Sequence, residues 1–519
     1  MIARRTLLGA GLGAGAALAA LPTGALAQSD PVATGKAGRW RGKRDGATQA
    51  FLGIRYGNDT SRTRFQPATA PRPVRETVAA TKFAVNCPQS SGLPNQDEDC
   101  LFLNVWTPDA NANARRPVMV YFHGGAYSNG TVIEPQVFGS TLAEKGDVVV
   151  VTVNHRLNAL GYLYLARLDP RFPDSGNNGQ LDLILALQWV RDNIIGFGGD
   201  PNRVMLFGQS GGGAKIATLM GTPAARNLFH TAATMSGQQV TASGPLNATA
   251  RAKALLGRLN ATPGDLIDMP VQRLIEGLRA EDPFLGGGVY MGPVLDMKWL
   301  VRHPFWPDAN PIGNHIPMIL GNTKDETRAF TDPKSELVRT LDWSNVAEWI
   351  APQLRIDAHP EWVVAEYRAR FPDWSVTDIF YAATTAGRSW RGQVIEAEER
   401  ARAGVPAWVY QFDYPSPIEP DRGAAHTHDI PMVFGTIGAE GTVSGTGPAA
   451  QALSDTMLRA FVNLAAKGDP NGTGVPQWPR HTLPDRQTMI FDAQSRVEND
   501  PRQWQRELFA RIPYIQPGT

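Results

Sequence analysis

The chain has 519 residues, a length that could hold two or three average domains. It contains no internal repeat, long charge run or polar linker, which favours a single elaborated domain. Its 50 basic and 49 acidic residues give a net charge of +1, which supplies no field for attracting nucleic acid or an anionic membrane surface. We therefore expect neither as a partner, and the composition leaves the oligomeric state open.

Residues 1–27 resemble an export signal. Arg4 and Arg5 precede an apolar stretch rich in Gly, Ala and Leu, and residues 25–27 place alanines where a signal peptidase needs small side chains. The paired arginines favour twin-arginine export, with the Sec route as the alternative. A membrane anchor is a weaker interpretation, because the stretch is short and Gly-rich and no later apolar run approaches the ~20 residues that span a bilayer. We expect residues 28–519 to form one domain, periplasmic or secreted, without stable membrane insertion.

The two cysteines of the chain, Cys87 and Cys100, lie close together in the sequence. In an exported protein such a pair most simply forms a disulfide, which would contribute on the order of 3 kcal/mol by closing this loop. A zinc site is a poor alternative, because no histidine lies nearby to complete four ligands.

Buried strands alternate with helical segments along the chain. One segment, 180–195, places Leu183, Leu187, Val190 and Ile194 on one helical face. Such alternation predicts an α/β fold with a mostly parallel sheet covered on both faces, so that ligands bind beyond the carboxyl ends of the strands. Segments 241–290 and 331–400 are expected to be helical insertions over the site. The predicted strands are residues 118–122, 148–153, 204–207, 231–236, 317–321 and 407–412.

The most informative motif is Gly-Gln-Ser-Gly-Gly at residues 208–212, directly after the apolar run 204–207. A serine between small residues, at a sharp turn from a strand into a helix, is typical of a nucleophile elbow. A Gly-rich loop with a solvated serine is the alternative, but the buried strand before it and the small-residue helix start after it favour the elbow. We therefore predict that Ser210 is a nucleophile.

A serine nucleophile needs an imidazole to accept its proton and an acid to orient that imidazole. In α/β-hydrolases these follow in the order Ser, acid, His, on loops after later strands. Downstream of Ser210, the loop after the strand at 317–321 carries Asp325 and Glu326, and the segment after the strand at 407–412 carries His426 and His428. Both the order and the placement fit a triad.

Several blocks of the sequence resemble the type-B carboxylesterase family, which includes the cholinesterases. Residues 197–213 match its serine signature, and residues 98–105, EDCLFLNV, match its second signature, EDCLYLNV, with one substitution. The blocks at 154–161 and 176–190 are also similar, so the resemblance runs from about residue 35 to beyond residue 434. The resemblance implies an α/β-hydrolase fold with helical insertions and a Ser, Glu, His triad.

The resemblance assigns Glu326 as the acid and His426 as the base, from the family patterns KDE and G-x-x-H-x-x-[ED]-[IL]. Asp325 is the rival acid, whose other role would be turn capping or a surface charge. His428 is the rival base, but two residues away in an extended segment it would point elsewhere, as a pocket or structural histidine. The two histidines lack the further neighbours that a metal site requires.

An oxyanion hole is predicted at residues 121–127, YFHGGAY, which follow a predicted strand. The resemblance assigns the backbone N–H donors to Gly125 and Ala126, with Gly211 as the third, and Gly124 would allow the loop to approach closely. Losing one such donor typically costs ~10²- to 10³-fold in rate.

Two residues depart from the family pattern, which usually has Glu before the serine and Ala after it. Gln209 removes a buried negative charge beside the nucleophile, which weakens support for a cationic imidazolium or substrate. Gly211 keeps the N–H and is expected only to loosen the backbone. The loop between the cysteines also lacks a Trp to cradle a quaternary ammonium, so choline esters are poor candidates.

Together these features predict an exported serine hydrolase of small-molecule carboxylic esters that acts through an acyl-enzyme and needs no metal or organic cofactor. A lipase for longer chains is the alternative within enzymes, and an amidase a weaker one. The alternative that is not an enzyme is a catalytically silent binding protein with the same fold. The acyl and alcohol preferences reside in insertion side chains whose convergence the sequence does not reveal.

Overall fold

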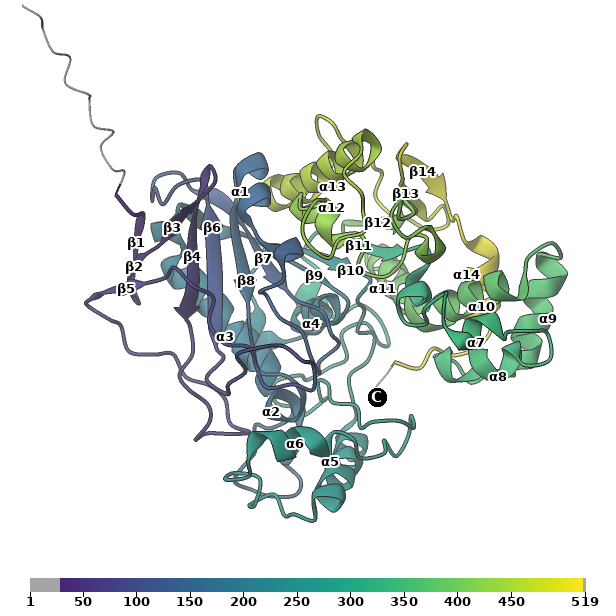
Figure 1. Cartoon of the computed structure of the whole chain (residues 1–519), viewed down its shortest axis with the longest axis horizontal. Coiled ribbons are helices and arrows are strands. Elements are labelled where there is room, and N and C mark those ends of the chain that lie inside the picture. The colour runs from purple at the N-terminus through teal and green to yellow at the C-terminus, as the bar shows by residue number, and fades with distance from the viewer. Residues whose placement is uncertain (1–28, 517–519) are drawn as a thin grey trace, which may run out of the picture.

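The computed structural model describes residues 29–516, so the predicted export signal at residues 1–27 lies outside the described residues. An eleven-stranded sheet forms the centre of this part of the chain (Figure 1). In spatial order its strands are β14 (Arg496–Asn499), β13 (Gln487–Phe491), β12 (Ala407–Phe412), β11 (Met318–Thr323), β10 (Thr231–Met235), β9 (Gly199–Gln209), β7 (Arg116–Phe122), β8 (Val149–Val153), β6 (Phe102–Thr107), β4 (Thr48–Arg55) and β3 (Lys43–Asp45). A smaller sheet contains β1 (Val32–Gly35), β2 (Gly38–Arg41) and β5 (Thr77–Ala79).

The middle of the large sheet is parallel and its two margins are antiparallel. Neighbouring strands from β8 through β7, β9, β10, β11 and β12 to β13 all pair in parallel. All six predicted strands are present, and β9 begins earlier than predicted, at Gly199. The prediction of an α/β-hydrolase fold with a mostly parallel sheet is confirmed.

Helices lie on both faces of the sheet and at its ends (Figure 1). The α-helices are α1 (Ser140–Gly146), α2 (Asn158–Tyr162), α3 (Asn178–Asn193), α4 (Gly211–Met220), α5 (Pro245–Leu259), α6 (Val271–Gly277), α7 (Glu336–Arg339), α8 (Val346–Ile350), α9 (Pro360–Arg370), α10 (Val376–Thr385), α11 (Arg391–Arg402), α12 (Ile430–Phe434), α13 (Pro448–Lys467) and α14 (Gln503–Ala510). Short 3₁₀ turns are η1 (Pro135–Val137), η2 (Ile194–Phe197), η3 (Pro223–Ala225), η4 (Pro311–Gly313), η5 (Glu326–Ala329), η6 (Ala351–Gln353) and η8 (Pro420–Arg422). A π-helix, η7 (Ala386–Trp390), joins α10 to α11.

Alternate residues of each central strand enter different cores, because successive side chains point to opposite faces of a sheet. Val120 of β7 belongs to an apolar cluster with Leu187 of α3 and Ile216 of α4. Its neighbour Tyr121 belongs to a second cluster with Phe461 of α13. The strands are therefore buried on both faces, as their continuous apolar sequences indicate.

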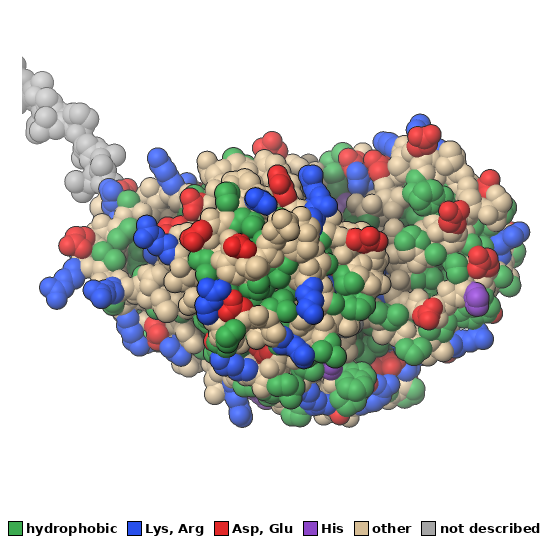
Figure 2. Space-filling model, turned by 90° about the horizontal axis from the view of Figure 1, so that it is seen from below, with side chains coloured by type: hydrophobic (Ala, Val, Ile, Leu, Met, Phe, Trp, Pro, Cys, Tyr) green, Lys and Arg blue, Asp and Glu red, His purple; other side chains and the backbone are tan. Residues whose placement is uncertain are grey.

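The two segments predicted as helical insertions form separate lobes beside the sheet. The segment 241–290 contributes α5 and α6. The segment 331–400 contributes α7 to α10, which lie with α14 beyond one end of the sheet (Figure 1), and most of α11, which packs against β11 and β12. The second lobe has its own apolar cluster, which includes Tyr367, Ile379 and Phe509. Figure 2 shows acidic and basic side chains interspersed over the face seen from below, in keeping with the balanced charge. Among the described residues, no helix is both long and apolar enough to span a membrane.

Candidate active site

The three predicted triad residues each follow a different parallel strand. Ser210 lies between β9 and α4, Glu326 begins η5 just after β11, and His426 lies in the loop between β12 and α12. Because parallel strands present their carboxyl ends at one edge of a sheet, these loops converge there. Ser210 and His426 line the same pocket, and Glu326 is completely buried behind His426.

Ser210 adopts the strained backbone that a nucleophile elbow requires, with φ 55° and ψ −125°. Its N–H donates to the Met235 carbonyl at 2.7 Å, which fixes the turn against β10. The packing leaves no room for a side chain at Gly237, where a Cβ would lie 1.9 Å from the Ser210 carbonyl oxygen. The neighbouring strand therefore holds the elbow in this conformation.

Glu326 and His426 are in direct contact. Nδ1 of His426 donates to Oε2 of Glu326, while Oε1 accepts hydrogen bonds from the Asn322 side chain at 3.1 Å and from the Thr323 N–H at 2.9 Å. Burial would raise the pKa of Glu326, but the charge of His426 and the hydrogen bonds from His426 and the Thr323 N–H hold it below its ordinary value. A carboxylate that is ionised and fixed in this way can orient the imidazole and stabilise its protonated form.

The other nitrogen of this imidazole meets the residue before the nucleophile. Nε2 of Gln209 lies 3.1 Å from Nε2 of His426, and the Gln209 side chain is buried. Because Nδ1 carries the proton shared with Glu326, Nε2 is the acceptor and the amide of Gln209 donates to it. No hydrogen bond in the described part of the chain joins Ser210 Oγ to His426, so Gln209 holds the position that the serine proton must reach. Catalytic hydrogen bonds often tighten only once substrate is bound.

The two rival residues have other partners. Asp325 accepts a hydrogen bond from the Ala424 N–H at 3.0 Å, and its own N–H donates to the Ala424 carbonyl at 3.0 Å, so it fixes the loop that carries His426. His428 accepts the Ala425 N–H at Nδ1 at 3.2 Å, and burial lowers its pKa to about 4. Neither side chain occupies the position of acid or base.

The predicted oxyanion loop follows β7 and lies beside the elbow. Gly125 and Ala126 have positive φ angles of 81° and 52°, which turn the loop toward Ser210. No hydrogen bond among the described residues uses the N–H groups of Gly125, Ala126 or Gly211, so all three remain available as donors. A Cβ on Gly124 would lie 3.2 Å from the Ser210 Cβ, in keeping with the close approach expected there.

Gly211 has a more specific role than the sequence indicated. A Cβ at this position would lie 2.0 Å from the carbonyl oxygen of Ala126 and 2.5 Å from its Cα. The expectation that Gly211 only loosens the backbone is therefore wrong. Its missing side chain lets the oxyanion loop rest directly on the first turn of α4.

Comparison with known proteins places this arrangement in a family. The model of the carboxylesterase family matches residues 29–509. The chain belongs to the carboxylesterase family. It is similar to a para-nitrobenzyl esterase of Bacillus subtilis (32% identity; 92% of this chain and 98% of that protein) and to a fumonisin B1 esterase of Sphingopyxis macrogoltabida (31%; 84% and 82%). A solved carboxylesterase of Geobacillus stearothermophilus at pH 6.2 superimposes with a TM-score of 0.83 at 31% identity, over 92% of this chain and 99% of the other. This protein is thus a carboxylic-ester hydrolase.

The esterase buries a lysine behind its oxyanion loop that sequence reasoning missed. Lys215 of α4 is completely buried, and its Nζ donates to the His123 carbonyl at 3.1 Å. No carboxylate among the described residues forms an ion pair with it, and burial lowers its pKa to about 7. Burial and the charge of Lys215 lower the pKa of His123 to about 3, so that histidine is neutral.

The pocket of the esterase is formed largely by residues that no motif indicated. They come from the loop after β10, from the end of the 241–290 segment, from the turn after η5, from the 331–400 lobe and from the C-terminal segment, which only tertiary packing brings together. These residues are Gln238, Gln239, Tyr290, Phe330, Arg355, Arg388, Ser389, Tyr514 and Gln516. Within residues 29–516, no cluster of three or more His, Cys, Asp or Glu could hold a metal ion.

Cys87 and Cys100 lie within one apolar core of the esterase and are both buried. The structure records them as free thiols, so it differs from the expected bridge. Hydrogen bonding to Cys87 and burial raise the pKa of the Cys100 thiol, which places the two sulfurs next to each other. The disulfide between them stays a prediction.

Proposed function

We propose that this esterase hydrolyses small-molecule carboxylic esters through an acyl-enzyme in which Ser210 is the nucleophile, His426 the base and Glu326 the orienting acid. The observation that carries the assignment is the direct contact of Glu326 with His426, which lines the same pocket as Ser210. The free N–H groups of Gly125, Ala126 and Gly211 are the proposed oxyanion donors.

In the proposed reaction, a bound ester displaces the Gln209 amide from Nε2 of His426. The Ser210 proton passes to Nε2 as Oγ bonds to the ester carbon, and the carbonyl electrons move onto the oxygen held by the three N–H groups. As the tetrahedral intermediate collapses, the bond to the alcohol oxygen breaks and His426 returns the proton to the leaving alcohol. Water then repeats the sequence on the acyl-enzyme and releases the carboxylic acid and Ser210.

The assignment is tested with Ser210→Ala. This variant should fold and should hydrolyse 4-nitrophenyl butyrate about 10⁴-fold or more slowly than the wild type. Ser91→Ala is the matched control, because the Ser91 hydroxyl lies outside the pocket and has no hydrogen-bond partner among the described residues. An organophosphate should also add to the peptide containing Ser210. Wild-type turnover by purified Ser210→Ala would overturn the proposal.

We further propose that residues 1–27 direct export and that Cys87 and Cys100 form a disulfide in the oxidising compartment. Arg4, Arg5 and the small residues before position 28 support the first part, and the adjacency of the two buried sulfurs supports the second. N-terminal sequencing of the exported protein should begin near Gln28. Alkylation in denaturant without reductant should leave both cysteines unlabelled, and labelling of both would contradict the bridge.

A further inference from the structure

The pocket that contains Ser210 also contains two arginines and no acidic lining residue. Arg355 follows η6 and Arg388 lies in the π-helix η7, so both come from the 331–400 lobe. Burial and the nearby charge of Arg355 together lower the pKa of Arg388 to about 10, so Arg388 remains charged at neutral pH. Arginine is the side chain that proteins do not deprotonate, so the lobe brings two cationic guanidinium groups into the pocket.

Neither arginine has an anionic partner among the described residues. Nη1 of Arg388 donates to the neutral amide oxygen of Gln353 at 2.8 Å, and its guanidinium stacks 4.3 Å from the centre of the Phe330 ring. The side chain of Arg355 makes no hydrogen bond within the described residues, and its Nε is buried. Uncompensated charges facing one another are costly when partly removed from water.

The nearest buried carboxyl groups do not fully neutralise this pair. Glu326 is bound to His426, and its charge raises the pKa of Arg388 by less than burial and the charge of Arg355 lower it. Glu396 accepts the N–H of Gln239 at 2.6 Å behind the pocket wall, and burial raises its pKa to about 8, so it is protonated at neutral pH. The pocket lining thus carries positive charge that no ion pair among the described residues neutralises.

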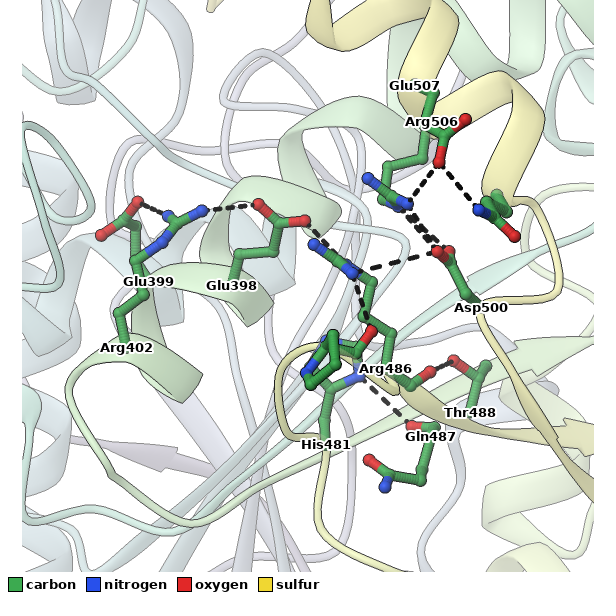
Figure 3. Close-up of polar contacts among 12 residues, drawn as sticks. Glu398, Glu399, Arg402, His481, Arg486, Gln487, Thr488, Asp500, Arg506 and Glu507 are labelled. Carbon is green, nitrogen blue, oxygen red and sulfur yellow. Dashed lines mark hydrogen bonds and ion pairs between the residues drawn. The ribbon is translucent and has the colours of Figure 1, made fainter.

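Arg388 has a fixed position close to the reaction centre. The Phe330 ring on which it stacks lies 4.9 Å, centre to centre, from the ring of His426. The helix that follows it, α11, is anchored at its other end by a network of charged side chains (Figure 3). In this network Arg486 contacts Glu398 of α11 at 2.9 Å and Asp500 at 4.0 Å. π-Helical turns of this kind occur frequently at functional sites.

We propose that the esterase selects esters that also carry a carboxylate, which Arg355 and Arg388 bind while the ester carbonyl lies at Ser210. Arginine suits this task, because its planar guanidinium binds carboxylates through charge-assisted hydrogen bonds. The substrates would be monoesters of dicarboxylic acids or esters of acidic alcohols. This inference rests on the proposed function, since it places the carboxylate relative to Ser210 as the nucleophile.

The test compares esters that differ only in charge. On the acyl side, mono(4-nitrophenyl) adipate is compared with its methyl ester, and on the alcohol side, 4-acetoxybenzoate is compared with methyl 4-acetoxybenzoate. We expect the ratio of kcat/KM, charged to neutral, to exceed roughly tenfold in at least one pair. Raising the salt concentration should reduce this ratio, because salt screens the attraction.

Arg355→Gln and Arg388→Gln should each lower that ratio roughly tenfold or more, because each removes a charge-assisted interaction. Arg391→Gln is the matched control: Arg391 begins α11, three residues after Arg388, is half-buried and does not line the pocket. Should an arginine variant fail to fold, adipate offers a test on the wild type. It should compete with the neutral ester, whereas its dimethyl ester should compete far less at equal ionic strength.

Two results would overturn the inference. One is a wild type that hydrolyses charged and neutral esters equally well in both pairs, or prefers the neutral ones. The other is a ratio that Arg355→Gln and Arg388→Gln leave unchanged. If either occurs while hydrolysis still depends on Ser210, the proposed function stands and only the carboxylate selectivity fails. Hydrolysis of the neutral esters by Ser210→Ala would instead remove the proposed function itself.

Discussion

The two sides of the nucleophile hold buried charge in opposite ways. On one side Glu326 pairs with His426, and the pairing keeps the pKa of the carboxyl below its ordinary value despite complete burial. On the other side Lys215 is equally buried but has no carboxylate partner among the described residues, only the His123 carbonyl and the face of the Tyr127 ring, and burial lowers its pKa to about 7. A partner thus preserves the ion at neutral pH, whereas burial without one favours the neutral form. This contrast gives four tests, from the largest expected effect to the smallest.

Removing the charge of Glu326, the partner of His426, should have the largest effect on activity. Glu326→Gln keeps the shape of the acid but removes its charge and can hold the imidazole in the wrong tautomer, so kcat/KM should fall by about 10³- to 10⁴-fold. Asp325→Asn is the neighbouring control, and we expect a much smaller loss because Asp325 contacts the Ala424 backbone and Arg328 rather than His426. Equal losses in the two variants would mean that the acid has been assigned to the wrong residue.

The burial of Lys215 without a carboxylate partner should make the free energy of unfolding depend on pH. The pKa of Lys215 is about 7 in the folded protein and near 10.4 in the unfolded chain, so the unfolded state binds more protons between these values. Its contribution to stability therefore rises with pH across this window and is least favourable below pH 7. Lys215→Met should remove a penalty on the order of several kcal/mol at pH 6 and little of it at pH 10.

Thermal unfolding of both proteins at pH 6 to 10 measures this difference. The stability of the variant relative to the wild type should decline steadily as the pH rises. Lys253→Met on α5, where the side chain is exposed, should give a curve parallel to that of the wild type. A parallel curve for Lys215→Met as well would show that the lysine does not titrate in this window.

Gly211→Ala tests whether the elbow tolerates the alanine that is usual in the family. The new Cβ would lie 2.0 Å from the Ala126 carbonyl oxygen, so the oxyanion loop must shift and a donor is misplaced. We expect kcat to fall by about 10²-fold with a smaller change in KM. Gly257→Ala on α5 has open space around its Cβ and should leave kcat unchanged. Undiminished kcat in Gly211→Ala would show that the loop contact is dispensable.

Gln209→Glu places a second carboxylate beside His426, in addition to Glu326, and should have the smallest effect of the four changes. Because Gln209 contacts Nε2 of His426, a negative charge there stabilises the protonated imidazole and competes with Ser210 for it. The acid limb of the kcat/KM profile should move to higher pH by up to about one unit. Gln239→Glu places the same charge elsewhere in the pocket wall and is the control. An identical shift in both variants would show that the added negative charge acts at a distance and not through the contact with His426.

The sequence was sufficient for the features that are local. The central strands could be predicted from their apolar runs, and the elbow at Ser210 from the small residues around it. Glu326 and His426 followed from their order after later strands together with a family pattern. The role of Gly211 was misjudged, because its close approach to Ala126 joins two segments 85 residues apart, and no local signal reports that distance.

The pocket wall and the buried lysine could not be predicted for the same reason. Arg355 and Arg388 lie in a segment that the sequence predicts as helical insertions over the site, but which of its side chains converge on Ser210 depends on how the lobe packs against the sheet. Lysine side chains usually face solvent, so the sequence gives no reason to expect Lys215 to be buried. Its burial depends on the packing of α4 beneath the loop after β7, and this tertiary contact has no signal in the local sequence.

The π-helix that carries Arg388 bears on how relatives of this esterase should be compared. Such a turn accommodates one more residue than an α-helix, and each residue rotates an α-helix by roughly 100°. A relative lacking that extra residue could keep an arginine in the aligned column and still direct it away from the pocket. Substrate preference would then follow a one-residue gap in the alignment, and the arginine alone would be a misleading marker.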